Sequence, residues 1–454
     1  MQGGLKHWTR ILLASAAFAM GAGQVSAETL VEAMVSAYSG NPTLQAERAR
    51  QRGTDELVPQ ALSGWRPTIT AEGSVGRLWS DTDAAPRTSS TPAEATIVLS
   101  QPIFRGFKTI NGTKSAEANV DAGRQSLLAV EQDIIFQVIQ AYMNVIRDRQ
   151  IVGLRQQNVG VLQKQLTAAD ERFKVGEITR TDVAQSRARV SGARSSVASA
   201  TATLAASVAN YINVVGHKPG SLKYPRLAKL PRSLEAAQAA ASEINPNILA
   251  AAYVEEASNY NIEVVKGDLL PSASLDASAQ FNDNPTDGTS RSETARIEGV
   301  LTIPLYEAGR VYSSVREAKH VASQRRLEVI QAGRSVRESV SISWNNLAAA
   351  REIIRSAKEQ VSAAQLALDG VRQEYFVGSR TTLDVLDAET EVVNARISLV
   401  SAERDCVWTL GGLLDETQFG LLRREARRVL APFVQADGGV AFVMPVPVIV
   451  ARKR

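Results

Sequence analysis

Two long stretches of the chain place apolar residues at helical spacing. In the first stretch, apolar side chains follow the three- and four-residue steps that keep one face of an α-helix apolar. They are Ile134, Ile135, Val138, Ile139, Tyr142, Met143, Val145 and Ile146. No proline, the strongest helix breaker, occurs from 103 to 218 or from 305 to 431. We therefore expect long helices over 105–174 and 307–376, each about 105 Å long at 1.5 Å per residue.

A shorter helix is predicted to follow each long helix and to run back along it. These return helices cover 181–213 and 383–413, and each has only about half the length of its partner. Further short helices near 42–64 and 245–267 can stack end to end on them and make up the missing length. The pattern thus predicts two helical hairpins, each pairing one long helix with one composite helix.

The segments before the long helices change from helical to alternating periodicity. Residues 272–281 alternate polar and apolar side chains without a break, as half-buried strands do. We expect a strand pair within 67–103 and another within 271–305, with strands of about ten residues, the length that crosses an outer membrane at a tilt. Polar linkers at 81–93 and 282–292 join the strands of each pair. The same alternation also fits a soluble β-sandwich.

The sequence contains an internal repeat. Several residues recur at an offset of 204 before the long helices and 202 within and after them. The matched pairs include Asn41-Pro42 with Asn245-Pro246, Val175-Gly176 with Val377-Gly378, and Asp182-Val183 with Asp384-Val385. A constant offset over more than a hundred residues indicates duplication. We expect a first repeat over 28–215, a linker over 216–244, a second repeat over 245–414 and a C-terminal tail over 415–454.

The N-terminus has the pattern of a secretory signal peptide. Lys6 and Arg10 precede an apolar run over 11–20, and small residues lead to Ala27. We expect residues 1–27 to be removed by cleavage after Ala27 and the chain to leave the cytoplasm. A retained N-terminal anchor is the alternative.

Composition removes several classes of chemistry. The chain has three histidines and one cysteine, Cys406, so a zinc site built from these ligands is not expected. Phosphate-binding glycine loops and nucleophile elbows do not occur. Lys and Arg number 51 against 47 Asp and Glu, interspersed along the predicted helices, which disfavours nucleic-acid binding. We therefore expect no enzyme activity, no catalytic residues, no metal and no cofactor.

Four strands are too few for one chain to seal itself in lipid. An open sheet edge in a bilayer leaves backbone groups unpaired, and the smallest barrels have about eight strands. The predicted fold is therefore mainly α with a membrane β-barrel that several copies of the chain share.

Two turn sequences and two strand-to-helix junctions resemble those of a known family. Residues 172–183 (RFKVGEITRTDV) and 375–387 (YFVGSRTTLDVLD) are similar to the periplasmic turns of TolC-type outer-membrane efflux proteins. Residues 101–104 (QPIF) and 303–310 (IPLYEAGR) are similar to that family's strand-to-helix junctions. With the repeat, the resemblance covers about 28–414.

The resemblance implies a homotrimeric α/β-barrel tunnel with 12 strands and 12 helices across three chains, and an equatorial domain that includes 216–244. It implies location in the outer-membrane lipid of a Gram-negative bacterium, extending into the periplasm. The implied function is the exit duct of a tripartite efflux or type I secretion system. The implied partners are a periplasmic adaptor and an inner-membrane efflux pump or ABC exporter.

The resemblance also assigns candidate site residues. Asp384 and Asp387, one helical turn apart, match carboxylate rings at the periplasmic aperture. Matches to a closed-state lock between neighbouring hairpins are Thr181, Asp182, Tyr375 and Arg380. Matches to adaptor-docking turns are Val175, Gly176, Val377 and Gly378. Helix capping also explains Asp384, since Thr381 lies three residues earlier, and plain turn geometry also explains the glycines.

Two other protein classes compete with this interpretation. A periplasmic coiled-coil adaptor or structural protein would also be exported and helical, but it would carry one hairpin instead of two. A secreted enzyme would require a convergent polar cluster, which the sequence does not indicate.

Overall fold

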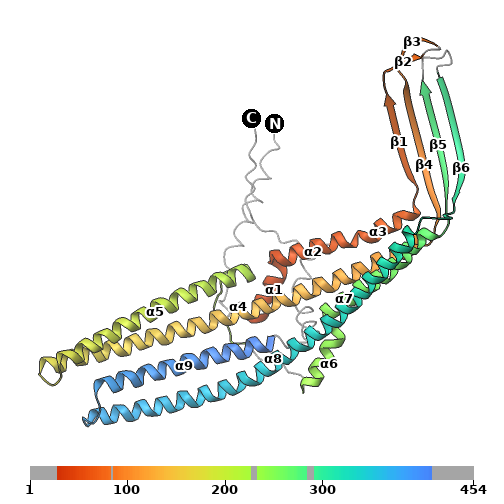
Figure 1. Ribbon diagram of the computed structural model, residues 1–454. Coiled ribbons are helices and arrows are strands. Elements are labelled where there is room, and N and C mark those ends of the chain that lie inside the picture. Colours follow the sequence, from red (N-terminus) through yellow and green to blue (C-terminus); the bar gives the residue numbers. More distant parts are fainter. Residues whose placement is uncertain (1–27, 83–84, 226–232, 284–290, 412–454) are drawn as a thin grey trace, which may run out of the picture. The chain divides into compact units, whose positions relative to one another are not determined.

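The computed structural model describes most of the chain between the expected signal peptide and tail (Figure 1). The described residues are 28–82, 85–225, 233–283 and 291–411. The predictions for 1–27 and 415–454 lie outside them. The described residues form two compact units. We call 28–41, 134–225 and 343–411 the hairpin unit, and the remainder the sheet unit.

Two helices of 67 residues each, α4 (Lys108–Lys174) and α8 (Arg310–Phe376), contribute residues to both units. Each is about 100 Å long by the rise of an α-helix. Both begin three residues later than the sequence predicts, because two residues before each helix have positive φ. These residues are Gly106 (58°), Phe107 (61°), Ala308 (49°) and Gly309 (80°). A left-handed pair cannot belong to a right-handed helix, so it turns the chain from strand to helix.

The hairpin unit also contains α1 (Leu30–Gly40), α5 (Arg180–Val215) and α9 (Thr382–Gly411). The return helices α5 and α9 have 36 and 30 residues, far fewer than the 67 of α4 and α8. α1, which the sequence analysis does not predict, begins with a capping box between Thr29 and Glu32.

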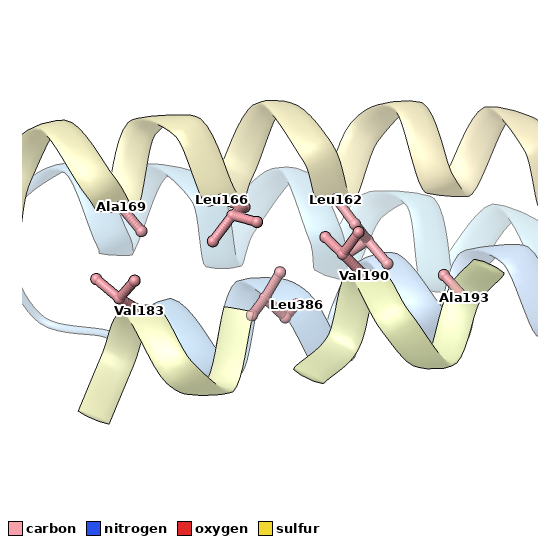
Figure 2. Packing of buried hydrophobic residues seen from close by; sticks show 7 residues of the cluster. All are labelled: Leu162, Leu166, Ala169, Val183, Val190, Ala193 and Leu386. Carbon is pink, nitrogen blue, oxygen red and sulfur yellow. The ribbon is translucent and has the colours of Figure 1, made fainter. Parts of the chain in front are cut away.

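An apolar cluster joins the helices of the hairpin unit (Figure 2). Its members are Leu162, Leu166 and Ala169 on α4, Val183, Val190 and Ala193 on α5, and Leu386 on α9. We call this cluster the α4–α5 seam. Leu386 is 2% exposed, and full burial of a leucine side chain contributes about 2 kcal/mol. Because Leu386 belongs to the second hairpin, its burial in the seam ties the two hairpins of one chain together.

The sheet unit contains four further α-helices and two 3-10 helices. They are α2 (Pro42–Asp55), α3 (Leu57–Leu62), η1 (Ser63–Trp65), α6 (Leu234–Ile244), α7 (Pro246–Lys266) and η2 (Gly267–Leu269). Helix α6 lies inside 216–244, the segment that the sequence predicts as a linker. It begins at Ser233, whose hydroxyl accepts a hydrogen bond from the Ala236 amide. None of the described helices is both long enough and apolar enough to cross a bilayer.

The sheet unit is built on one antiparallel sheet in the order β1-β4-β5-β6 (Figure 1). Its strands are β1 (Thr68–Val75), β4 (Ala93–Arg105), β5 (Ser272–Asp283) and β6 (Arg291–Thr302). The repeats meet at the β4–β5 pair, where Ile97 lies opposite Ala279. Both edge strands, β1 and β6, are exposed along their whole length.

The segment that the sequence predicts as a polar linker over 81–93 contains a further strand. β3 (Ala85–Ser90) pairs with β2 (Leu78–Thr82) as a separate two-stranded sheet. This small sheet extends the connection between β1 and β4.

Candidate functional site

The sequence-predicted site residues gather at the tips of the two hairpins, around the turns 175–179 and 377–381. All of them belong to the hairpin unit. No group of three or more His, Cys, Asp or Glu side chains suited to hold a metal ion occurs in the described part of the chain.

The two tip turns have the same backbone geometry. Gly176 and Gly378 both have φ of 79°. The Gly176 amide donates to the Phe173 carbonyl at 3.0 Å, and the next amide donates to the Arg172 carbonyl at 2.9 Å. The second turn repeats this Schellman pattern, with the Gly378 amide 3.1 Å from the Tyr375 carbonyl oxygen. The backbone conformation alone thus accounts for both glycines.

The valines beside these glycines have no such backbone explanation. Val175 is 78% exposed and Val377 is 80% exposed, at the outermost point of each hairpin. A large apolar side chain in that position is available to a partner. Of the four predicted docking residues, the valines are therefore the ones that offer contact surface.

Asp182 and Asp384 both act as helix caps. The Thr381 amide donates to Asp384 Oδ2 at 2.9 Å, its hydroxyl donates to the same oxygen at 2.8 Å, and the Asp384 amide donates back to Thr381 Oγ1 at 3.3 Å. Thr179 and Asp182 form the equivalent capping box at the start of α5. These bonds to Thr381, the backbone bond first, hold the pKa of Asp384 below its ordinary value.

Asp387 has a different partner, an arginine from the other hairpin. Arg189 Nη2 on α5 lies 2.5 Å from Asp387 Oδ1 on α9. The Arg189 side chain is 43% exposed and the Asp387 side chain 55% exposed, so the pair lies on the surface of the hairpin unit. The two predicted aperture acids therefore differ: Asp384 forms part of the cap of its own helix, whereas Asp387 is ion-paired with a residue of the other hairpin.

Tyr375 also connects the two hairpins. Its hydroxyl accepts a hydrogen bond from the Arg172 guanidinium at the end of α4, and it lies 3.3 Å from Thr382 Oγ1. The Arg172 guanidinium carbon also lies 5.0 Å from the centre of the Tyr375 ring, which adds a cation–π contact.

The remaining predicted lock residues do not meet one another within the chain. Arg380 Nε donates to Glu374 Oε2 at 2.7 Å, near the end of α8 in the same hairpin, and the Asp182 carboxylate accepts a hydrogen bond from the Thr179 hydroxyl. Thr181 is exposed. Within one chain, the structure thus brings Tyr375 to Arg172 but does not bring Arg380 to Asp182.

Sequence reasoning missed Arg172, Arg189, Thr382 and Leu386. A signal for Arg189 lies in the repeat. The first repeat has Gln185 where the second has Asp387, and Arg189 where the second has Glu391. Asp387 thus has no acidic counterpart in the first hairpin, and Arg189 lies one helical turn after the position that corresponds to Asp387, which makes Arg189 a candidate partner for it. Leu386 has no comparable signal, because many leucines in amphipathic helices have the same spacing.

Together the helices and sheet define a duplicated protein in which each repeat supplies two long strands and one helical hairpin. The chain belongs to the outer membrane efflux protein family, whose model matches residues 33–217 and 238–413.

Individual relatives agree with this membership. The chain is 40% identical to the outer membrane efflux protein BepC of Brucella suis over 86% of its own length and 85% of BepC. It is 27% identical to the outer membrane protein TolC of Escherichia coli, over 83% of this chain and 79% of TolC. Among solved structures, the outer membrane protein VceC of Vibrio cholerae has a TM-score of 0.71 at 17% identity, covering 87% of this chain and 95% of VceC. The fold is therefore that of these channels.

Proposed function

We propose that three copies of this chain form the outer-membrane exit duct of a tripartite efflux or type I secretion system. The duct receives its cargo from an inner-membrane pump or ABC exporter through a periplasmic adaptor. It conducts passively and has no catalytic role. The observation that carries the proposal is the pair of free sheet edges, β1 and β6, since family membership agrees with a location in the outer membrane.

The sheet order allows copies to join head to tail. Because every pairing in the sheet is antiparallel, β6 runs opposite to β1. β6 of one copy can therefore pair antiparallel with β1 of the next, and three copies close a ring of 12 strands. Closure satisfies the edge backbone groups, which lipid cannot do.

The long helix α8 supports the same assembly. One side of it is buried against its own chain through mostly small residues, for example Ala350, Ala357 and Ala364. Other positions around this helix expose large apolar residues. They include Leu327 (66% exposed), Ile342 (53%), Ile353 (56%) and Leu366 (74%). Large apolar side chains exposed at several positions of a long helix are typical of surfaces that a partner covers. We assign neighbouring copies of the chain as that partner.

The aperture assignment makes an electrical prediction. In a trimer, Asp384 and Asp387 supply six carboxylates around the pore. Asp384→Ala with Asp387→Ala is expected to weaken the block of single-channel current by a trivalent cation at least tenfold. The measurement is planar-bilayer recording with the detergent-extracted protein. If the double variant forms channels and the block is unchanged, neither acid lines the aperture.

The cap on Asp384 predicts a pH dependence. Its lowered pKa means that Asp384 stays charged to a lower pH than a free aspartate, whose pKa is about 3.9. In an Asp387→Asn background, cation block should persist as pH falls and disappear only below that value. Thr381→Ala removes one hydrogen bond to the charged form and raises the pKa, so block should disappear at higher pH. If Thr381→Ala does not shift the pH at which cation block disappears, Asp384 is not the group that binds the cation.

A further inference from the structure

The Arg189–Asp387 ion pair is positioned by packing. Val190, next to Arg189, is 3% exposed, and Leu386, next to Asp387, is 2% exposed. Both apolar side chains belong to the α4–α5 seam, where Figure 2 shows them on facing helices. Packing in the seam thus fixes the backbone positions of Arg189 and Asp387. The ion pair lies beside this apolar contact, at its solvent edge.

The pair also changes what Asp387 presents to solvent. A guanidinium 2.5 Å from the carboxylate offsets its negative charge toward any cation farther away. Asp384 is different, because its carboxylate is held mainly by hydrogen bonds from Thr381, and the nearby Arg380, which is ion-paired with Glu374, makes a smaller electrostatic contribution. Asp387, which has no acidic counterpart in the first hairpin, is therefore the one of the two carboxylates in direct contact with a guanidinium.

The geometry links this charge to the separation of the hairpins. Arg189 lies on α5 and Asp387 on α9, 198 residues apart in sequence, so the pair can persist only while these helices lie together. Moving α9 away from α5 would break the pair and free the carboxylate. Since both side chains are about half exposed, the contact is a weak one that can open readily.

We propose that Arg189 determines the cation affinity of the entrance: paired with Asp387 it cancels that carboxylate and holds α5 to α9, and its release exposes the carboxylate. The inference rests on the proposed channel function. It assigns a role to a residue outside the aperture set, and it makes the contribution of Asp387 to cation binding a property of the opened entrance.

The test is a double-mutant cycle on the full protein in planar bilayers, with hexamminecobalt(III) as the blocking cation. The four proteins are the wild type, Arg189→Gln, Asp387→Asn and the double variant. Arg189→Gln is expected to lower the half-blocking concentration on the order of tenfold. Asp387→Asn should raise that concentration more in the Arg189→Gln background than in the wild type. Arg187→Gln, which removes the same charge from an exposed site two residues earlier on α5, is the matched control and should have a smaller effect.

A charge swap separates pairing from simple loss of charge. Asp387→Arg alone places two cations together and should increase the resting conductance, whereas Arg189→Asp combined with Asp387→Arg should restore it. Additive effects in the cycle, an equal effect of Arg187→Gln, or no restoration by the swap would overturn the proposal for Arg189. Failure of the wild-type protein to form channels would instead overturn the proposed function.

Discussion

Ile353→Glu combined with Leu366→Glu is expected to abolish trimer formation while leaving the helix content of the chain unchanged. Both side chains are exposed on α8, at 56% and 74%, so neither substitution disturbs the packing within one chain. In a trimer each would be covered by a neighbouring copy. Burying a large apolar side chain contributes about 1.5–3 kcal/mol, and burying an unpaired carboxylate opposes association by more.

The change is repeated at every interface of a threefold assembly, so its effect on the trimer is multiplied. The readout is native mass spectrometry of the detergent-extracted protein, with circular dichroism to confirm helix content. Ile353→Val with Leu366→Met retains the apolar surface and is the control that should remain trimeric. A trimeric glutamate variant would show that these two positions of α8 do not lie at interfaces between copies.

Leu386→Ala is expected to destabilise the hairpin unit by about 2–4 kcal/mol, because it leaves a cavity in the α4–α5 seam. Since Leu386 is the member of the seam supplied by α9, its loss also weakens the contact between the hairpins. The entrance should therefore open more often, which raises single-channel conductance. Chemical unfolding followed by circular dichroism measures the first effect, and bilayer recording measures the second.

Leu383→Ala supplies a matched control on the same helix. Leu383 lies three residues earlier and is 37% exposed, so its truncation should cost less than about 1 kcal/mol and leave conductance unchanged. Equal effects of the two substitutions would mean that Leu386 does not tie the hairpins together.

Much of the fold follows from local features of the sequence. Long stretches without proline and with helical spacing indicate the long helices, and the repeat offset relates the two hairpins. The starts of α4 and α8 were harder to predict, because Phe107 and Ala308 adopt positive φ, which residues other than glycine rarely do. No helix was predicted at α1 or α6, because both are short, α1 follows the expected leader and α6 lies inside the linker.

In the candidate site, local contacts could be predicted from the sequence, and contacts between the hairpins could not. The capping role of Asp384 was foreseeable, since Thr381 lies at the spacing of a capping box. The partners of Asp387 and Tyr375 were not, because each comes from the other hairpin. Arg189 and Arg172 reach these residues only through the packing of α5 and α4 against the second hairpin. Contacts between residues about 200 positions apart depend on tertiary structure, which local pattern does not encode.

The most direct test of the account is the assembly state of the chain in the outer membrane. In the proposed duct, neighbouring copies cover the sheet edges at β1 and β6 and the exposed apolar residues of α8. Native mass spectrometry of the protein extracted from the outer-membrane fraction should give a species of three chains. A monomer that stays in aqueous solution without detergent would contradict the shared duct and, with it, the roles assigned to Asp384, Asp387 and Arg189.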